Sequence, residues 1–280
     1  RPSRAGSSVS AEMPLDLLLA LSGLLAGAFG ALLGLGGGIL IVPILTLGFD
    51  MPLTAAVGTS LICVIATSTG GAAVNVRAGR ADVRLGILLG AGTVVGALTG
   101  GVAAGLLPER IIAGLFAGLL AYTSYRMGRE ALRRPDTTGE QRRPSTPSET
   151  AGGSDPGRRR LPAALGGSFV AGNVSGLLGV GGGIVIVPLL HLTMGAPMRV
   201  AVATSNFMIG ITAAAGAYAY LFRGDVDANV AAPVVLGVAI GSALGARWSG
   251  RVRQSWLVGL FVVVMLYVAS QMALRALGSA

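Results

Sequence analysis

Two glycine-rich stretches hold the residues best suited to bind a ligand without charged side chains. GLGGGILIVPIL spans residues 34–45 and GVGGGIVIVPLL spans residues 179–190, with nine of twelve positions identical at an offset of 145. Consecutive glycines permit backbone dihedrals that other residues avoid and leave the amide groups bare. A helix beginning there has unpaired first N–H groups, which together with the helix dipole favour an anion. We therefore predict an anion site at the glycines of both stretches: Gly36, Gly37, Gly38, Gly181, Gly182 and Gly183. The alternative is that the glycines only allow helices to approach closely.

A Thr-Ser pair follows each glycine stretch. Thr59 and Ser60 recur as Thr204 and Ser205, and Asn206 follows only the second pair. Hydroxyl and amide groups can donate to the oxygens of an anion without adding a fixed charge. For the threonines, bonding within the helix or to a neighbouring helix is an equally good interpretation. We predict that Asn206 binds the ligand, because a buried amide needs partners.

The composition places these motifs in a membrane. The chain is 52% hydrophobic and only 12% charged, with 45 glycines among 280 residues, whereas soluble domains are about 25% charged. Long blocks such as 17–49, 85–107 and 257–274 are almost free of charge, and about 20 apolar residues span a bilayer. The net charge of +9 comes from arginines, with no lysine, that flank the apolar blocks. This placement indicates membrane topology rather than nucleic-acid binding.

The sequence predicts an all-α integral membrane protein built from two inverted repeats, with about 8 to 10 helical segments. Each repeat has one glycine-broken helix or hairpin and three spanning helices. The predicted parts are an N-terminal tail (1–14), a first repeat (15–128), a hydrophilic linker rich in Arg, Pro, Ser and Gly (129–160) and a second repeat (161–277). Segments 39–48 and 184–194 are apolar but shorter than a bilayer core. Hydropathy therefore leaves two options for each segment, a full crossing of the membrane or re-entry from one side.

The arginines predict the orientation. If the linker is cytoplasmic, the loop with Arg77 and Arg84 also falls inside, as does Arg247, while Asp50 and both termini fall outside. This arrangement obeys the positive-inside tendency in every short loop. Equivalent turns of the two halves then lie on opposite faces, which is why we expect inverted repeats.

No set of residues predicts catalysis, a metal site or a cofactor. The chain has a single histidine, His191, a single cysteine, Cys63, and no carboxylate pair within an apolar block. Glycines at GxxxG-like spacing could pack helices within one chain or between two, so a homo-oligomer stays an option; they are Gly92, Gly96, Gly100, Gly237, Gly241 and Gly245.

The two glycine stretches, with AVGTSL at 56–61 and AVATSN at 201–206, resemble the TauE/SafE sulfite exporter family. The resemblance covers about residues 17–274 and omits the linker. It implies a transporter in the plasma (inner) membrane that moves sulfite or another small organosulfur anion by alternating access. It also implies that the triple glycines and the Thr-Ser pairs are the family's motif positions in this chain.

Two alternatives to sulfite export remain. The first is an importer of another small anion, because the sequence fixes neither direction nor substrate. The second is a non-transporting membrane protein that binds or regulates, with the linker recruiting a cytoplasmic partner. Deleting residues 135–157 distinguishes the second alternative from a transporter. A transporter should keep its flux without these residues, whereas a protein that recruits a partner through them should lose its function.

Overall fold

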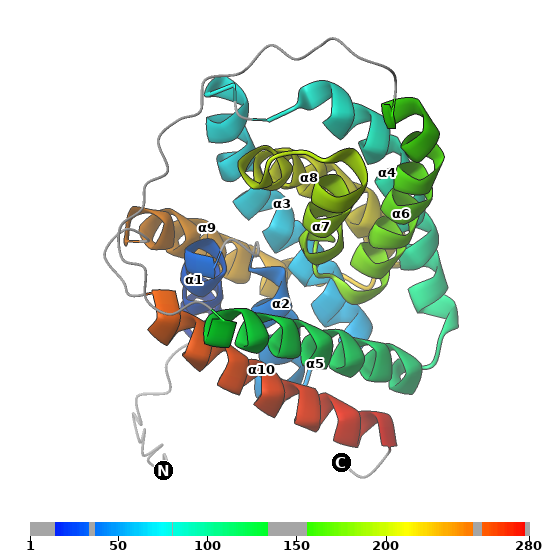
Figure 1. Cartoon of the computed structure of the whole chain (residues 1–280). Helices are drawn as coiled ribbons and strands as arrows, with labels where there is room; N and C mark the ends of the chain where they lie inside the picture. Colours follow the sequence, from blue (N-terminus) through cyan, green and yellow to red (C-terminus); the bar gives the residue numbers. More distant parts are fainter. Residues whose placement is uncertain (1–14, 34–36, 80, 134–155, 249–253, 278–280) are drawn as a thin grey trace, which may run out of the picture.

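The structure is a computed structural model that describes residues 15–33, 37–79, 81–133, 156–248 and 254–277 (Figure 1). These residues form ten α-helices and one short π-helical segment, η1, and they contain no strand. In chain order the elements are α1 (Leu15–Leu33), α2 (Gly38–Pro43), η1 (Ile44–Gly48), α3 (Leu53–Arg77), α4 (Val83–Leu106), α5 (Glu109–Arg133), α6 (Pro156–Leu178), α7 (Gly183–Met194), α8 (Met198–Arg223), α9 (Ala228–Trp248) and α10 (Gln254–Leu277).

Prolines and capping residues set many of the helix ends. Helices α3, α5 and α8 each begin directly after a proline, at Pro52, Pro108 and Pro197. Asp82 caps α4, because its side chain accepts a hydrogen bond from the Leu85 amide at 3.0 Å. Gly224 ends α8 in the left-handed conformation that glycine adopts without strain.

The two segments that follow the glycine stretches differ from each other. In the first, Pro43 ends α2 after six residues, and the chain continues as η1. In the second, the equivalent Pro188 lies inside α7, which runs unbroken for 12 residues. At about 1.5 Å per residue, both segments are shorter than a hydrocarbon core of about 30 Å.

The closest helix contacts join one repeat to the other. Helix α1 packs along α9, and α6 packs along α4. An ideal Cβ at Gly241 would lie 2.1 Å from the Leu24 carbonyl oxygen, and one at Gly96 would lie 2.1 Å from the Phe169 carbonyl oxygen. These two contacts are equivalent at the offset of 145. The same interface therefore occurs twice: in one the second repeat supplies the glycine and the first the carbonyl, and in the other these roles are reversed. The GxxxG-like glycines therefore pack helices within this chain.

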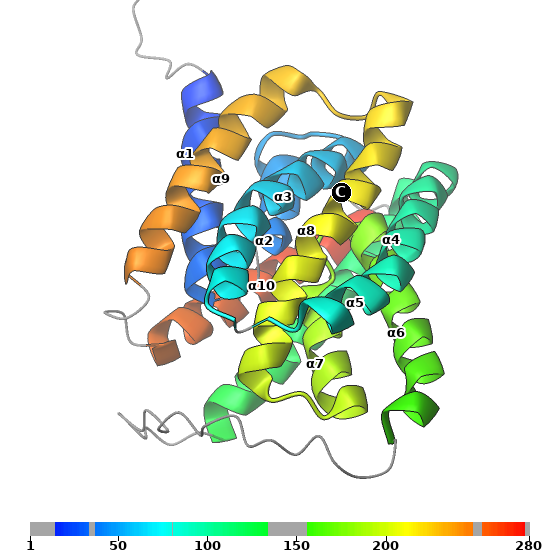
Figure 2. The ribbon, with the colours of Figure 1, turned by 90° about the horizontal axis from the view of Figure 1, so that it is seen from above.

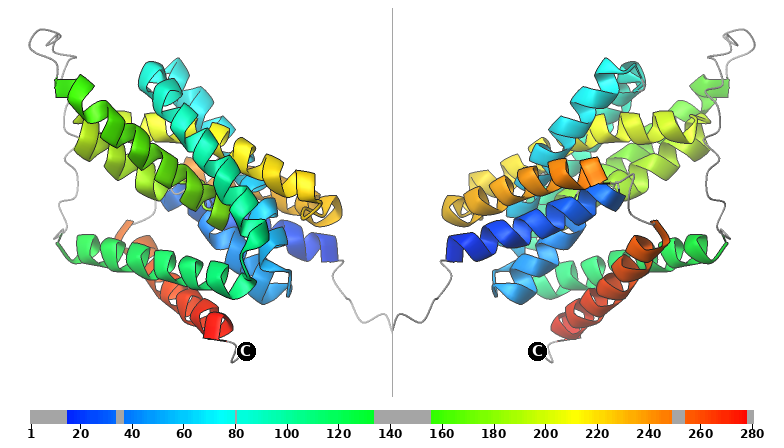
Figure 3. Two further views of the ribbon diagram at one scale, coloured as in Figure 1. Left: turned by 90° about the vertical axis from the view of Figure 1, so that its right-hand side faces the viewer. Right: turned by 90° about the vertical axis from the view of Figure 1, so that its left-hand side faces the viewer.

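The equivalent helices α3 and α8 pack against each other between these two pairs (Figure 2). Gly58 of α3 lies against Tyr220 of α8, whereas Ser68 lies against Gly210. Residue numbers increase along α3 while the numbers of the contacting residues on α8 decrease, so α3 and α8 run antiparallel. The remaining equivalent helices, α5 and α10, also pack together and lie along one side of the other helices (Figure 3).

Apolar residues cover much of the outer surface. Leu106 and Phe222 are 83% and 82% exposed, and many other large apolar side chains are also exposed. Within the described residues, four stretches are long and apolar enough to cross a membrane: Leu53–Gly70, Val83–Leu106, Val200–Arg223 and Ala228–Gly245. The chain is thus a multi-pass membrane protein. The spans expected elsewhere in the sequence stay predictions.

Helix extends into the segment expected to be the linker. Helix α5 continues to Arg133, and α6 begins at Pro156. Both extensions are polar, and hydropathy alone does not detect a helix that continues beyond its apolar part. Residues 134–155 and the predicted tail, 1–14, lie outside the described residues.

The glycine interfaces lead to a stability prediction. We expect Gly96→Ala to lower the melting temperature of the detergent-solubilised protein, because its Cβ has no room beside the Phe169 carbonyl. Overpacking of this kind costs about 1–3 kcal/mol. The control is Gly90→Ala on the same helix, where nothing lies within 4 Å of the added Cβ. Alanine should hold or raise stability there, since it favours helix by about 1 kcal/mol. Equal melting temperatures for the two variants would contradict the packing described here.

Candidate functional site

Each glycine stretch begins a helix inside the protein. Gly37 precedes α2 with φ of 71°, and Gly182 precedes α7 with φ of 69°, both in the left-handed region. The Gly182 carbonyl accepts hydrogen bonds from the amides of Val185 and Ile186, at 3.0 Å each. The first amides of these helices have no partner within the helix. The local geometry is therefore that of a helix start with bare donors, as the sequence predicts.

The two glycine stretches also contact each other. An ideal Cβ at Gly38 would lie 2.7 Å from the carbonyl oxygen of Gly179. Ser60 Oγ donates a hydrogen bond to the same oxygen at 2.5 Å. A glycine is needed at position 38 because the backbone of the second stretch occupies the space of a side chain. Two residues predicted from the first repeat, Gly38 and Ser60, thus meet the second repeat.

Around the second stretch, the nearest side chains come from α3, α6, α7 and α8. Gly181 faces Val64 of α3 and Ile209 of α8, with Ile209 also against Gly183. Ser205 Oγ lies 3.8 Å from the Cβ position of Gly183. The structure therefore groups three of the predicted residues, Gly181, Gly183 and Ser205, at the start of α7.

The threonines of the Thr-Ser pairs have different surroundings. Thr204 Oγ1 accepts a hydrogen bond from the Asp82 amide at 2.9 Å, which joins α8 to the start of α4. Thr59 is fully buried, and its Oγ1 has no hydrogen-bond partner. Asn206 is half-buried on α8, and Gly36 lies outside the described residues. The Thr204 hydroxyl is thus bonded to the start of α4, whereas the Thr59 hydroxyl has no partner.

Two residues at the glycine stretches were missed by sequence reasoning. Val64 and Ile209 wall the second stretch, and they are equivalent at the offset of 145. Each lies one helical turn after the serine of its own pair. Apolar residues carry no chemical signature in a hydrophobic chain. The repeat offset and the helical spacing together could have found them.

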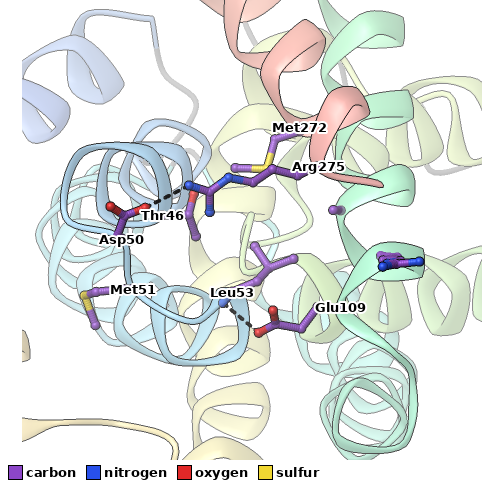
Figure 4. Close-up of a pocket in the computed structure, with 9 residues that line it drawn as sticks. Thr46, Asp50, Met51, Leu53, Glu109, Met272 and Arg275 are labelled. Carbon is purple, nitrogen blue, oxygen red and sulfur yellow. Dashed lines mark hydrogen bonds and ion pairs between the residues drawn. The ribbon is translucent and has the colours of Figure 1, made fainter. Parts of the chain in front are cut away.

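A cavity of about 500 Å³ lies elsewhere, at the end of the first broken segment (Figure 4). Asp50 and Arg275 form an ion pair across it at 3.0 Å, and Glu109 accepts a hydrogen bond from the Leu53 amide at 3.1 Å. Thr46, Met51 and Met272 are among the other lining residues. These contacts tie the turn between η1 and α3 to α5 and α10. The cavity and the glycine stretches are thus separate features.

His191, which occupies the position equivalent to Thr46, is exposed on α7. Its Nδ1 lies 2.9 Å from the Ala196 carbonyl oxygen, just beyond the end of the same helix. This contact helps to close the turn that follows α7.

The two glycine stretches and the two Thr-Ser pairs lie in the part of the chain that matches a known protein family. The family described as "Sulfite exporter TauE/SafE" matches residues 19–272. The chain belongs to the TauE/SafE family. The match includes both glycine stretches and both Thr-Ser pairs, so the TauE/SafE assignment covers both repeats.

Relatives in bacteria, archaea and plants support the assignment. The chain is 28% identical over 263 residues to "Probable membrane transporter protein YunE" of Bacillus subtilis, covering 91% of this chain and 96% of that protein. It is 30% identical over 213 residues to "Probable membrane transporter protein MJ0441" of Methanocaldococcus jannaschii, covering 73% and 72%. It is 32% identical over 107 residues to "Sulfite exporter TauE/SafE family protein 6" of Arabidopsis thaliana, covering 37% and 25%. No solved structure matches the chain. The protein is therefore a membrane transporter of the TauE/SafE family.

Proposed function

We propose that this protein exports sulfite or a related small organosulfur anion across the plasma membrane by alternating access. The observation that carries the proposal is the contact between the two glycine stretches at Gly38 and Gly179. This contact brings two helix starts with bare amides into one region of the protein, and helix starts favour anions. The family description and the name of the plant relative support the substrate class.

The side chains nearest to the glycines of the two stretches, within the described residues, are neutral. They are Val57, Ser60, Val64, Ser175, Ile186, Ser205 and Ile209. Amides and hydroxyls offer partial charges, which attract an anion less strongly than an arginine at low dielectric. A transporter must release what it binds, so we propose that the neutral lining keeps the substrate exchangeable. Binding and release of this kind need no cofactor, no metal and no catalytic group.

We infer that Gly37, Gly38, Gly181, Gly182 and Gly183 hold the substrate, with Gly36 as the sixth glycine of the motif. Thr59, Ser60, Ser205 and Asn206 supply side-chain donors or position the glycines. For Thr204, its bond with the Asp82 amide favours a positioning role. Access then alternates by movement of one repeat against the other.

We also propose that the repeats are inverted in the membrane. Antiparallel packing of the equivalent helices α3 and α8 supports this, because equivalent helices that span a membrane in opposite directions belong to inverted repeats. The distribution of arginines supports it independently. The linker then faces the cytoplasm, and both termini face outward.

The glycine site makes a prediction for binding. We expect calorimetry to detect saturable sulfite binding to the purified protein, with sulfate as the comparison anion, and expect Gly182→Val to abolish it. A branched side chain is strained at φ of 69° and would distort the start of α7.

The matched control is Gly195→Val at the other end of the same helix. Gly195 has φ of 65°, and nothing lies within 4 Å of an added Cβ. The backbone strain is the same, but the glycine site is untouched, so binding should persist. Equal sulfite affinity for wild type and folded Gly182→Val would remove the second glycine stretch from the site.

The inverted arrangement can be tested by labelling single cysteines in a Cys63→Ala background. Ala78 and Ala228 are exposed residues on the α3–α4 connection and at the start of α9, which are equivalent parts of the two repeats. We expect an impermeant maleimide to modify Ala228→Cys in intact cells, and Ala78→Cys only after permeabilisation. Labelling of both from the same side would contradict inversion.

A further inference from the structure

Two buried serine hydroxyls beside the second glycine stretch have no hydrogen-bond partner. Ser175 on α6 is fully buried, and Ser205 on α8 is 1% exposed. Their Oγ atoms are both unpaired. Buried polar groups in proteins are nearly always paired, and an unpaired one lowers stability. Two such groups near one backbone feature therefore need an explanation.

Both serines lie at the start of α7. Ser175 Cβ is 3.3 Å from the Cβ position of Gly182, and Ser205 Oγ is 3.8 Å from the Cβ position of Gly183. Helix α7 has 12 residues, so its dipole and its bare first amides face the same region. The amides and the two hydroxyls together supply several donors to one place. The side chains of Val64 and Ile209 form an apolar wall beside them, and a low dielectric strengthens hydrogen bonds.

The first glycine stretch lacks an equivalent set of donors. The position equivalent to Ser175 is Gly30, which has no side chain. The position equivalent to Ser205 is Ser60, whose hydroxyl is already bonded to the Gly179 carbonyl. The α-helical part of the first segment is also only six residues long. Thr59 Oγ1 in the first repeat is also unpaired, but Thr59 is not among the side chains nearest to the glycines of either stretch. The two stretches are thus similar in sequence but differ in the unpaired hydroxyls beside their glycines.

We infer that the anion is held mainly at the second stretch, by the first amides of α7 together with the hydroxyls of Ser175 and Ser205. This inference rests on the proposed function and adds Ser175 as a substrate-binding residue. The ligand class is a small anion with several acceptor oxygens on one sulfur atom, such as sulfite or the sulfonate end of an organosulfur compound. Ser60 instead fixes the backbone of the second stretch. Both free hydroxyls are closed off from solvent in this conformation, so the anion reaches them in a more open state of the transport cycle.

Alanine substitutions and sulfite calorimetry test this assignment. We expect Ser175→Ala and Ser205→Ala each to weaken sulfite binding about ten- to a hundredfold, because a hydrogen bond to a charged group has about this effect. Neither should lower the melting temperature, since each removes an unpaired buried group. The matched control is Ser124→Ala on α5. Ser124 Oγ is also buried and unpaired, but it belongs to neither glycine stretch. The control should bind sulfite as the wild type does.

The outcomes separate this inference from the proposed function. If the wild type binds sulfite and both serine variants bind it equally well, the assignment of Ser175 and Ser205 is overturned while the transporter proposal stands. If Ser124→Ala weakens binding as much as the other two, the effect is general and the assignment is also overturned. If the folded wild type binds no sulfite, the proposed substrate fails, and the assignment fails with it.

Discussion

Close contact between helix backbones of the two repeats is the constraint on which the rest of this structure depends. Glycines on α4 and α9 let the carbonyls of α6 and α1 approach to distances that any side chain would block. Lipid is as apolar as the helix surfaces, so the hydrophobic effect does little to hold helices together in a membrane. Helix association there depends instead on close packing contacts of this kind. Because each pair joins one repeat to the other, neither half can form its full set of helix contacts alone. Packing of one repeat against the other also brings the two glycine stretches into contact.

Polar contacts across the repeats add precision to this packing. Thr212 of the second repeat donates to Thr93 of the first at 2.7 Å, and the Asp82 amide of the first repeat donates to Thr204 of the second at 2.9 Å. Ser60 bonds the Gly179 carbonyl from a position 119 residues away in the chain. These contacts pair polar groups of one repeat with polar groups of the other in an apolar interior, where an unpaired polar group is costly. The hydroxyls of Ser175 and Ser205 are unpaired, as are those of Thr59 and Ser124, but Ser175 and Ser205 lie beside the start of α7, which is why we connect them with a ligand.

Much of the fold could be predicted from the sequence because its signals are local. Apolar blocks, prolines before helices and the duplicated glycine runs predicted the membrane class and most helix positions. The helical extensions to Arg133 and from Pro156 were not predicted, since hydropathy does not register a polar helix. The site was less predictable. The difference between Ser60 and Ser205 depends on a tertiary partner, and Val64 and Ile209 are ordinary apolar residues until the repeats are packed together.

The most direct test of the account is counterflow of labelled sulfite in proteoliposomes. Vesicles containing the purified protein are preloaded with unlabelled sulfite and diluted into a trace of labelled sulfite. The account predicts transient, saturable accumulation of label inside, which excess external sulfite suppresses and which liposomes without protein do not show. Accumulation no greater than in protein-free liposomes, with folded and correctly inserted protein, would contradict the claim that this chain transports sulfite.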